Sequence, residues 1–105
     1  MENAFDKIIA HLDRKKPKKD YGSDIPRKPY YLIEKLDSCY MLNVDYNYIN
    51  LNIFYFPDKV YTPYKVSIEK QCVFGRARQE LGTYYYEDTT HSQEDVIEII
   101  RYRLR

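Results

Sequence analysis

The sequence has no tryptophan, and only three glycines and two cysteines among its 105 residues. Three glycines leave little material for a loop that cradles phosphates, and neither the P-loop pattern nor Gly-x-Gly-x-x-Gly occurs. The Gly-x-Ser-x-Gly pattern that presents a nucleophilic serine is missing as well. We therefore predict a protein that is not an enzyme and that carries no cofactor.

Long hydrophobic runs are also missing. Apolar stretches such as residues 53–56 fall far short of the ~20 residues that a membrane helix requires. The N-terminus carries Glu2 and Asp6 within an amphipathic pattern, which differs from the basic start of a secretion signal. The sequence predicts a cytoplasmic protein that has no membrane as a partner.

The cysteines and histidines match no metal-binding spacing. Cys39, Cys72, His11 and His91 form neither Cys-x-x-Cys nor His-x-x-x-His. The two cysteines could pair in an oxidising compartment, yet each lies in an apolar stretch, where a buried free thiol is the usual state. We predict no metal site, and the sequence leaves the pairing of the cysteines open.

Charge of one sign is not in excess, because the net charge is +1. This balance excludes an acidic mimic of DNA and a basic protein that coats nucleic acid. The asymmetry is local. Residues 14–28 are rich in lysine and arginine, whereas residues 87–98 carry five carboxylates and no lysine or arginine.

Helical periodicity occurs at both ends of the chain. Phe5, Ile8, Ile9 and Leu12 have the spacing of one helix face and predict a helix over about 4–15, with Asn3 as its N-cap. Near the C-terminus, a cap-like pair and an apolar stripe predict a second helix. These residues are Ser92 with Asp95, and Val96, Ile97, Ile100 and Leu104.

Between the helices the period changes to two, which indicates strands. The apolar set changes parity between residues 40–48 and 49–55, so one uninterrupted strand cannot bury both sets. We favour a hairpin near 45–48 over a bulge. Pro63 predicts an edge position for the strand over 64–69. Residues 71–82 are ambiguous, because 76–81 contain helix formers but the stretch is short and lies between Gly75 and Gly82, whereas residues 83–86 are rich in strand formers.

These patterns predict one α+β domain that spans residues 1–105. An N-terminal helix, an antiparallel meander of four to five strands and a C-terminal helix follow one another, with both helices packed on one sheet face. Residues 16–29 contain three prolines and a glycine, and we predict that they form a basic, exposed connector.

Aromatic residues are abundant, with 13 tyrosines and four phenylalanines. Tyrosine favours binding faces, and Phe54 and Phe56 share strand parity with Asn50 and Asn52, a mixture more typical of an interface than of a core. We predict a non-catalytic protein that binds another protein or a nucleoprotein complex, as small phage-encoded inhibitors and immunity proteins do by analogy alone. The sequence leaves a homodimer open. The predicted protein-binding residues are Tyr46, Tyr48, Phe54, Phe56, Tyr61, Tyr84 and Tyr86.

An alternative function is nucleic-acid binding through the basic connector. Lysines release counterions when they bind phosphates, and nearby tyrosines could stack on unpaired bases. The competing interpretation is a solvated linker that keeps the protein soluble. The residues of this alternative are Lys15, Lys16, Lys18, Lys19, Arg27 and Lys28.

Overall fold

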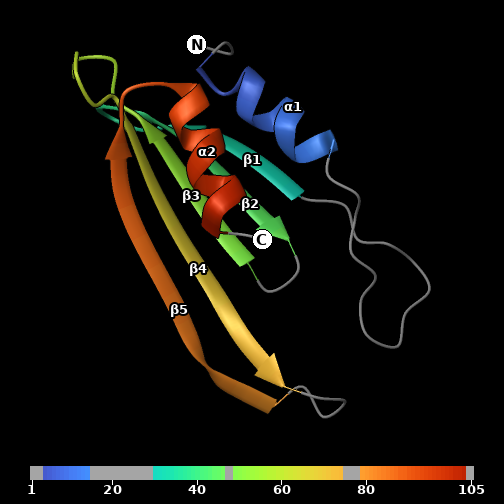
Figure 1. Cartoon of the computed structure of the whole chain (residues 1–105). Coiled ribbons are helices and arrows are strands. Elements are labelled where there is room, and N and C mark those ends of the chain that lie inside the picture. Colours follow the sequence, from blue (N-terminus) through green and yellow to red (C-terminus); the bar gives the residue numbers. More distant parts are fainter. Residues whose placement is uncertain (1–3, 15–29, 47–48, 75–78, 104–105) are drawn as a thin grey trace.

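The computed structural model describes residues 4–14, 30–46, 49–74 and 79–103 (Figure 1). Two helices flank five strands in the order that the sequence predicts. The elements are α1 (Asp6–Arg14), β1 (Tyr30–Lys35), β2 (Tyr40–Tyr46), β3 (Ile49–Tyr55), β4 (Tyr64–Phe74), β5 (Gln79–Thr90) and α2 (Gln93–Arg103).

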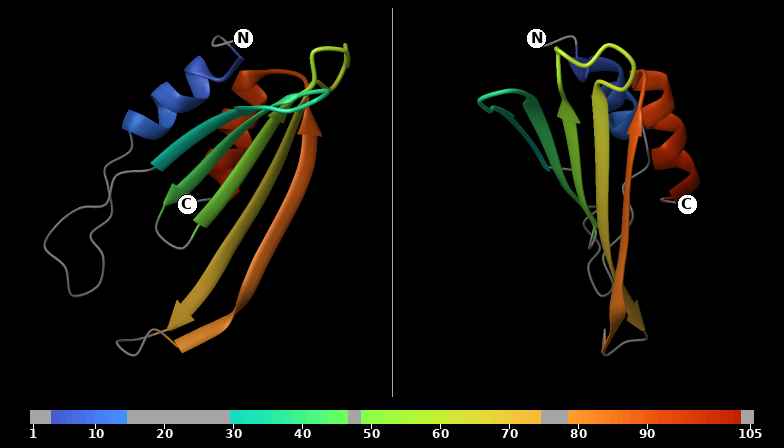
Figure 2. Two further views of the ribbon diagram at one scale, coloured as in Figure 1. Left: turned by 180° about the vertical axis from the view of Figure 1, so that it is seen from behind. Right: turned by 90° about the vertical axis from the view of Figure 1, so that its left-hand side faces the viewer.

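The five strands form one antiparallel sheet in which spatial order follows chain order. Both helices lie on the same face of this sheet, as Figure 1 and the two further views of Figure 2 show. The predicted α+β architecture, with five strands and helices at both ends, is therefore confirmed. No helix in the described part of the chain is long and apolar enough to cross a bilayer.

The change of parity near residue 47 reflects a hairpin, as predicted. Tyr46 pairs with Ile49, and Leu42 lies opposite Ile53. Because the chain reverses direction between β2 and β3, the even-numbered apolar residues of one strand and the odd-numbered ones of the next face the same side. One two-residue connection thus buries both apolar sets.

The ambiguous stretch 71–82 belongs to a long hairpin. β4 continues to Phe74 and β5 begins at Gln79, with a register shift between Cys72 and Val73 near Gly82, whose φ is +140°. Because β3 starts pairing at Lys70, residues 71–74 and 79–83 project beyond the rest of the sheet. We call this part the two-stranded arm, and Figure 1 shows it extending away from both helices.

The predicted edge position of the strand that follows Pro63 is wrong. β4 lies between β3 and β5 and pairs with both. Pro63 precedes the strand, so its missing N–H removes no ladder bond, and its carbonyl oxygen accepts a hydrogen bond of 2.7 Å from the Phe56 N–H. Proline is compatible with a central strand when it stands just before the strand begins.

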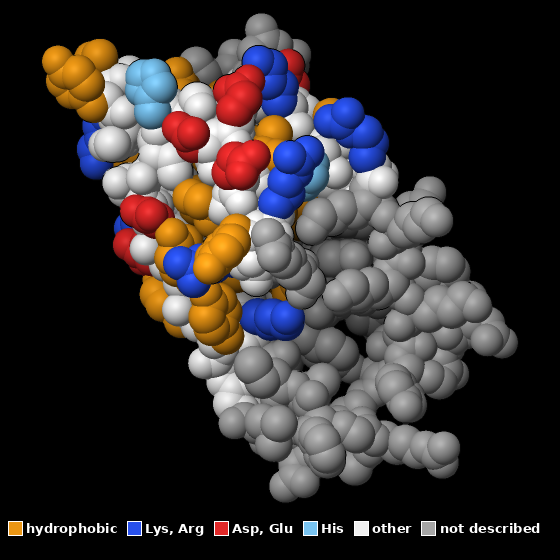
Figure 3. Space-filling model, viewed as in Figure 1, with side chains coloured by type: hydrophobic (Ala, Val, Ile, Leu, Met, Phe, Trp, Pro, Cys, Tyr) orange, Lys and Arg blue, Asp and Glu red, His pale blue; other side chains and the backbone are white. Residues whose placement is uncertain are grey.

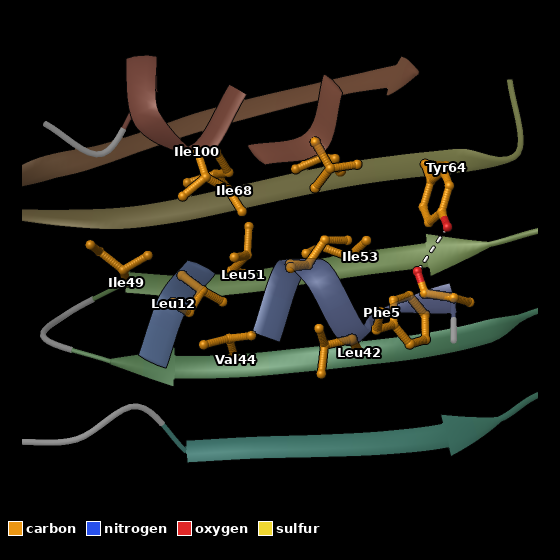
Figure 4. Packing of buried hydrophobic residues seen from close by; sticks show 14 residues of the cluster. Phe5, Leu12, Leu42, Val44, Ile49, Leu51, Ile53, Tyr64, Ile68 and Ile100 are labelled. Atoms are coloured by element: carbon orange, nitrogen blue, oxygen red, sulfur yellow. Dashed lines mark hydrogen bonds between the residues drawn. The ribbon is translucent and has the colours of Figure 1, made fainter. Parts of the chain in front are cut away.

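The hydrophobic core lies between the helices and the covered face of the sheet. Phe5 and Leu12 come from the α1 segment and Ile100 from α2, and they pack with strand residues such as Leu51 and Ile53 (Figure 4). The buried side chains recur every second residue in the strands and about every 3.6 residues in the helices. This is why the apolar periodicity of the sequence predicted which residues are buried.

The N-terminal ends of the two helices contact each other. Ser92 caps α2 as predicted, since its Oγ accepts a hydrogen bond from the Asp95 N–H at 3.2 Å. Asn3, the predicted cap of α1, lies outside the described residues. Gln93 Oε1 instead accepts hydrogen bonds from the N–H groups of Lys7 at 2.9 Å and Ile8 at 3.4 Å. These are the groups that a capping side chain normally satisfies, so α2 caps α1.

The two cysteines lie toward opposite ends of the sheet. Cys39 is buried and has a free thiol. It precedes Tyr40, which pairs with Tyr55, and Tyr55 in turn pairs with Tyr64. Cys72 lies eight residues further along β4, roughly 26 Å away at the usual rise per residue. A disulfide requires Cα atoms within about 7 Å. The open question of pairing is thereby answered: the two residues do not form a disulfide.

Candidate functional site

The face of the sheet opposite the helices carries the candidate site. In the described part of the chain no helix covers it, and the left view of Figure 2 shows its strands in front of α2. The strand register assigns residues of one parity to this face. We call it the open face, and its described residues are Tyr30, Leu32, Glu34, Met41, Asn43, Asp45, Asn50, Asn52, Phe54, Lys65, Ser67, Glu69, Thr83, Tyr85, Glu87 and Thr89.

Three half-buried asparagines occupy the centre of the open face. Asn43 Nδ2 donates to Asn52 Oδ1 at 2.6 Å and to Asn50 Oδ1 at 3.4 Å. Asn52 Nδ2 donates to Asn50 Oδ1 at 2.9 Å. Within the described residues, Asn50 Nδ2 and Asn43 Oδ1 make no hydrogen bond. The cluster therefore offers donors and an acceptor that are already held in place by their neighbours.

An aromatic pair lies at one end of the open face. The rings of Phe54 and Phe56 stack with centroids 6.4 Å apart and an interplanar angle of 27°. Lys59 Nζ lies 4.5 Å from the centroid of Phe56, and Lys65 Nζ lies 5.9 Å from that of Phe54. Both rings are half-buried although neither of the two described helices lies over them. They form an apolar contact area bordered by cations.

Polar side chains of β4 and β5 form a second cluster beside the asparagines. Tyr85 Oη donates to Glu87 Oε2 at 2.6 Å, and Lys65 Nζ lies 3.2 Å from Glu87 Oε1. Ser67 Oγ donates to Tyr85 Oη at 3.4 Å. The hydrogen bond from Tyr85 and then that from Lys65 lower the pKa of Glu87 below its usual value, so this carboxylate stays ionised.

The charge of the open face is negative. Among its described residues are four exposed carboxylates and one lysine, Lys65, a net of 1 − 4 = −3. The carboxylates belong to Glu34, Asp45, Glu69 and Glu87. A phosphate backbone is repelled by such a surface, whereas cationic or amide groups of a protein are attracted.

The predicted protein-binding residues fall on different parts of the molecule. Phe54 and Phe56 lie at the open face, and Tyr61 is 84% exposed in the loop between β3 and β4. Tyr84 and Tyr86 lie on the helix-covered face, because Tyr86 pairs with the buried Ile68. The side chain of Tyr46 and all of Tyr48 are outside the described residues. The structure thus brings together only part of the predicted set.

Arg103 of α2 accounts for the position of Tyr84 and Tyr86. Its guanidinium donates to Tyr84 Oη at 3.1 Å and lies 4.0 Å from the ring centroid of Tyr86. Hydrogen bonding to Asp88 raises the pKa of Tyr86. Figure 3 shows hydrophobic and basic side chains intermixed on this side of the molecule. These two tyrosines help attach α2 to the edge of the sheet.

The sequence-based set omitted Tyr85 and Asn43. The strand formers at 83–86 predicted that the tyrosines lie on a strand, but not which of them face the helices. The pairing of Glu69 with Tyr85 decides this, and it depends on the register shift near Gly82. Asn43, Asn50 and Asn52 alternate with apolar residues in the sequence, and this pattern would have indicated Asn43 as a further residue of the binding surface.

The residues of the nucleic-acid alternative, at 15–28, lie outside the described residues. Among the described residues, His11 is half-buried on α1, Cys39 is buried, and His91 Nδ1 lies 3.1 Å from the Tyr61 carbonyl oxygen. No group of three metal-ligating side chains occurs in the described ranges. No family model, curated protein or solved structure matches this chain.

Proposed function

We propose that this chain is a non-catalytic binding protein that recognises another protein through its open face. The observation that carries the proposal is the arrangement on that face. A half-buried asparagine cluster lies beside both the Phe54–Phe56 stack and the Tyr85–Glu87 pair, and no helix among the described residues covers them.

The composition of the face supports a protein partner. Binding energy in protein interfaces concentrates in a few aromatic anchors surrounded by polar contacts that exclude water. Phe54 and Phe56 supply the aromatic area, and the amides of Asn43 and Asn50 supply hydrogen bonds that fix orientation. The asparagines are ordered by one another, so little side-chain entropy is lost when a partner binds.

The charge of the face favours a protein over nucleic acid as the partner. A surface that binds single-stranded nucleic acid combines stacking rings with a positive groove. The open face has the rings but carries four carboxylates, including Glu69 and Glu87 beside Tyr85. A partner with basic or amide-rich side chains matches this surface, and the inhibitor role of the sequence-based prediction is one form that such binding takes.

The test is a quantitative pull-down from a lysate of the native source, followed by calorimetry with the purified partner. The open-face variant carries Phe54→Ala and Tyr85→Ala, and the matched control carries Tyr102→Ala on α2, where the tyrosine is 64% exposed. We expect the wild type and the control to capture the same protein. The open-face variant should bind it at least about tenfold more weakly, the usual effect of removing interface anchors.

Circular dichroism establishes that each variant is folded before binding is compared. The proposal fails if the folded open-face variant captures the same partner with unchanged affinity. It also fails if Tyr102→Ala removes binding while Phe54→Ala with Tyr85→Ala does not, since that result places the interface on the helix side.

A further inference from the structure

The outer edge of β1 has no partner strand in the described part of the chain. The Leu36 N–H donates to the Cys39 carbonyl oxygen at 2.8 Å, and this bond fixes the phase of the β1–β2 ladder. In an antiparallel pair, hydrogen-bonded and non-hydrogen-bonded positions alternate. Residues 32, 34 and 36 therefore bond to β2, and Tyr31, Ile33 and Lys35 point their N–H and C=O groups away from the sheet.

At the centre of this edge the side chains are apolar on both faces. Leu32 on the open face is 41% exposed, and Ile33 on the opposite face is 51% exposed. Sheets normally protect their edges with charges, bulges or covering segments. The other edge strand, β5, has such protection, because it presents Glu87 and Asp88 and contains the irregularity near Gly82. β1 carries its two charges, Glu34 and Lys35, toward its C-terminal end, whereas Leu32 and Ile33 at its centre are exposed in the described part of the chain.

The residues of β1 are complementary to themselves in an antiparallel arrangement. A two-fold axis at Ile33 places this residue opposite Ile33 of a second copy. Tyr31 then faces the second copy's Lys35, and Leu32 faces its Glu34, so each charge meets an uncharged side chain. The pairing of Tyr31 with Lys35 also brings a cation to an aromatic ring. No like charges lie directly opposite each other in this register.

We propose that a second copy of this chain pairs with the outer edge of β1, so that the two sheets join into one continuous antiparallel sheet. The two-fold axis is normal to the sheet, which keeps both open faces on one side and all helices on the other. The dimer is independent of the proposed function, because its contacts lie at the strand edge and not at Phe54, Phe56 or Tyr85.

The dimer is expected to be weak. Stable interfaces bury about 1,200–2,000 Å² in total, and a strand of six residues supplies an area at or below the lower end of that range. Association should therefore appear only as the concentration rises from micromolar toward millimolar. This association is recognised by amide groups along β1 that are alternately protected and not protected from hydrogen exchange.

The first experiment is sedimentation velocity across that concentration range with three proteins. These are the wild type, Ile33→Lys, and the control Val60→Lys, which makes the same chemical change at a loop residue that is 76% exposed. We expect the mass of the wild type and of the control to rise from 12.8 kDa toward twice that value. Ile33→Lys should remain a monomer, because two lysines then meet at the two-fold axis.

The second experiment follows amide hydrogen exchange in the wild type as its concentration rises. Protection should increase at Tyr31, Ile33 and Lys35 and remain constant at Leu32 and Glu34, which already bond to β2. A mass that stays at the monomer value in all conditions overturns the proposal, as does dimerisation of Ile33→Lys. Association without the alternating protection also overturns it. If Ile33→Lys does not fold, the exchange pattern of the wild type decides alone.

Discussion

Tyr64 connects the sheet to the segment that precedes α1. Its side chain is buried, and Oη donates to the Ala4 carbonyl oxygen at 2.7 Å (Figure 4). Burial, followed by the neighbouring Tyr55, raises the pKa of Tyr64 to about 12 from the usual 10.0. The protonated phenol is therefore the form that the folded protein favours, and this has a consequence for stability at alkaline pH.

We predict that the free energy of unfolding falls as the pH rises from about 10 to about 12, the interval between the unfolded and folded pKa of Tyr64. The contribution is fully present below pH 10, because the phenol is then protonated in both states. Tyr64→Phe should cost about 1 kcal/mol at neutral pH by losing the hydrogen bond, and should lose less stability over the alkaline interval. Urea denaturation at a series of pH values measures both effects.

The control for this prediction is Tyr61→Phe, which changes a tyrosine that is 84% exposed. Its alkaline loss of stability should equal that of the wild type. Tyr31 contributes to the loss in every variant, since burial and the hydrogen bond to Asp13 raise its pKa too. An unchanged alkaline slope in Tyr64→Phe would contradict the assignment to Tyr64.

Sequence reasoning predicted the core residues better than the surface ones. Leu42, Val44 and Ile53 followed from alternation alone, because an apolar side chain has a strong preference for the buried side. Tyrosine has no such preference, since its ring favours burial and its hydroxyl favours water. The face on which Tyr84, Tyr85 and Tyr86 lie was therefore decided by strand register and by contacts with Arg103.

At the scale of elements, α1 depends on α2 for its first turn. Gln93 Oε1 accepts from two backbone N–H groups of α1, and its Nε2 donates to Asp6 Oδ1 at 3.0 Å. The residue before α1, Phe5, has no side-chain oxygen to perform this task. A helix of nine residues is marginal by itself, so it is stabilised mainly by contacts such as these and by its buried side chains.

Gln93→Ala should lower the free energy of unfolding by about 1 kcal/mol, the usual effect of losing a helix cap. The amides of Lys7 and Ile8 should also exchange faster with solvent. Urea denaturation and hydrogen exchange by NMR measure the two effects. The matched change is Glu94→Gln, which removes the exposed ion pair between Lys7 Nζ and Glu94 at 2.7 Å. That variant should lose less stability than Gln93→Ala, because an ion pair exposed to solvent contributes little.

Equal losses in Gln93→Ala and Glu94→Gln would contradict the prediction, because the exposed ion pair would then stabilise the fold as much as the cap does. The sequence predicted both helices and the cap of α2, because these depend on neighbouring residues. The cap of α1 could not be predicted in this way, since its acceptor lies 86 residues away. Elements were predictable where the signal is local, and the edge position assigned to β4 was wrong because strand order is not local.

At the scale of the whole molecule, packing is concentrated at one end of an elongated shape. The principal extents are 46 × 25 × 24 Å, and the two-stranded arm projects beyond β3 along the long direction. A hairpin that pairs only with itself has marginal stability in water. The sequence predicted the topology of the sheet but not the arm, because helix-forming residues at 76–81 obscured the continuation of β4 and β5.

We predict that hydrogen exchange is graded along the molecule, with arm amides at 71–74 exchanging faster than those at Val66 and Ile68. Gly82→Ala should increase exchange in the arm and leave Val66 and Ile68 unchanged. A φ of +140° disfavours a residue with Cβ by on the order of 1–3 kcal/mol, although the added atom meets nothing within 4 Å. Exchange that is uniform along β4, or that increases equally everywhere in Gly82→Ala, would contradict local opening of the arm.

The cap that Gln93 supplies to α1 also sets an order of events during synthesis. A ribosome adds about 5–20 residues per second, so the 86 residues that separate Lys7 from Gln93 take about 4 to 17 s to translate. Throughout that interval the nascent α1 lacks its cap, and during the first half of it the strands against which Leu12 and Phe5 pack are still being translated. Of the two described helices, α1 therefore completes its structure only after α2 has been made.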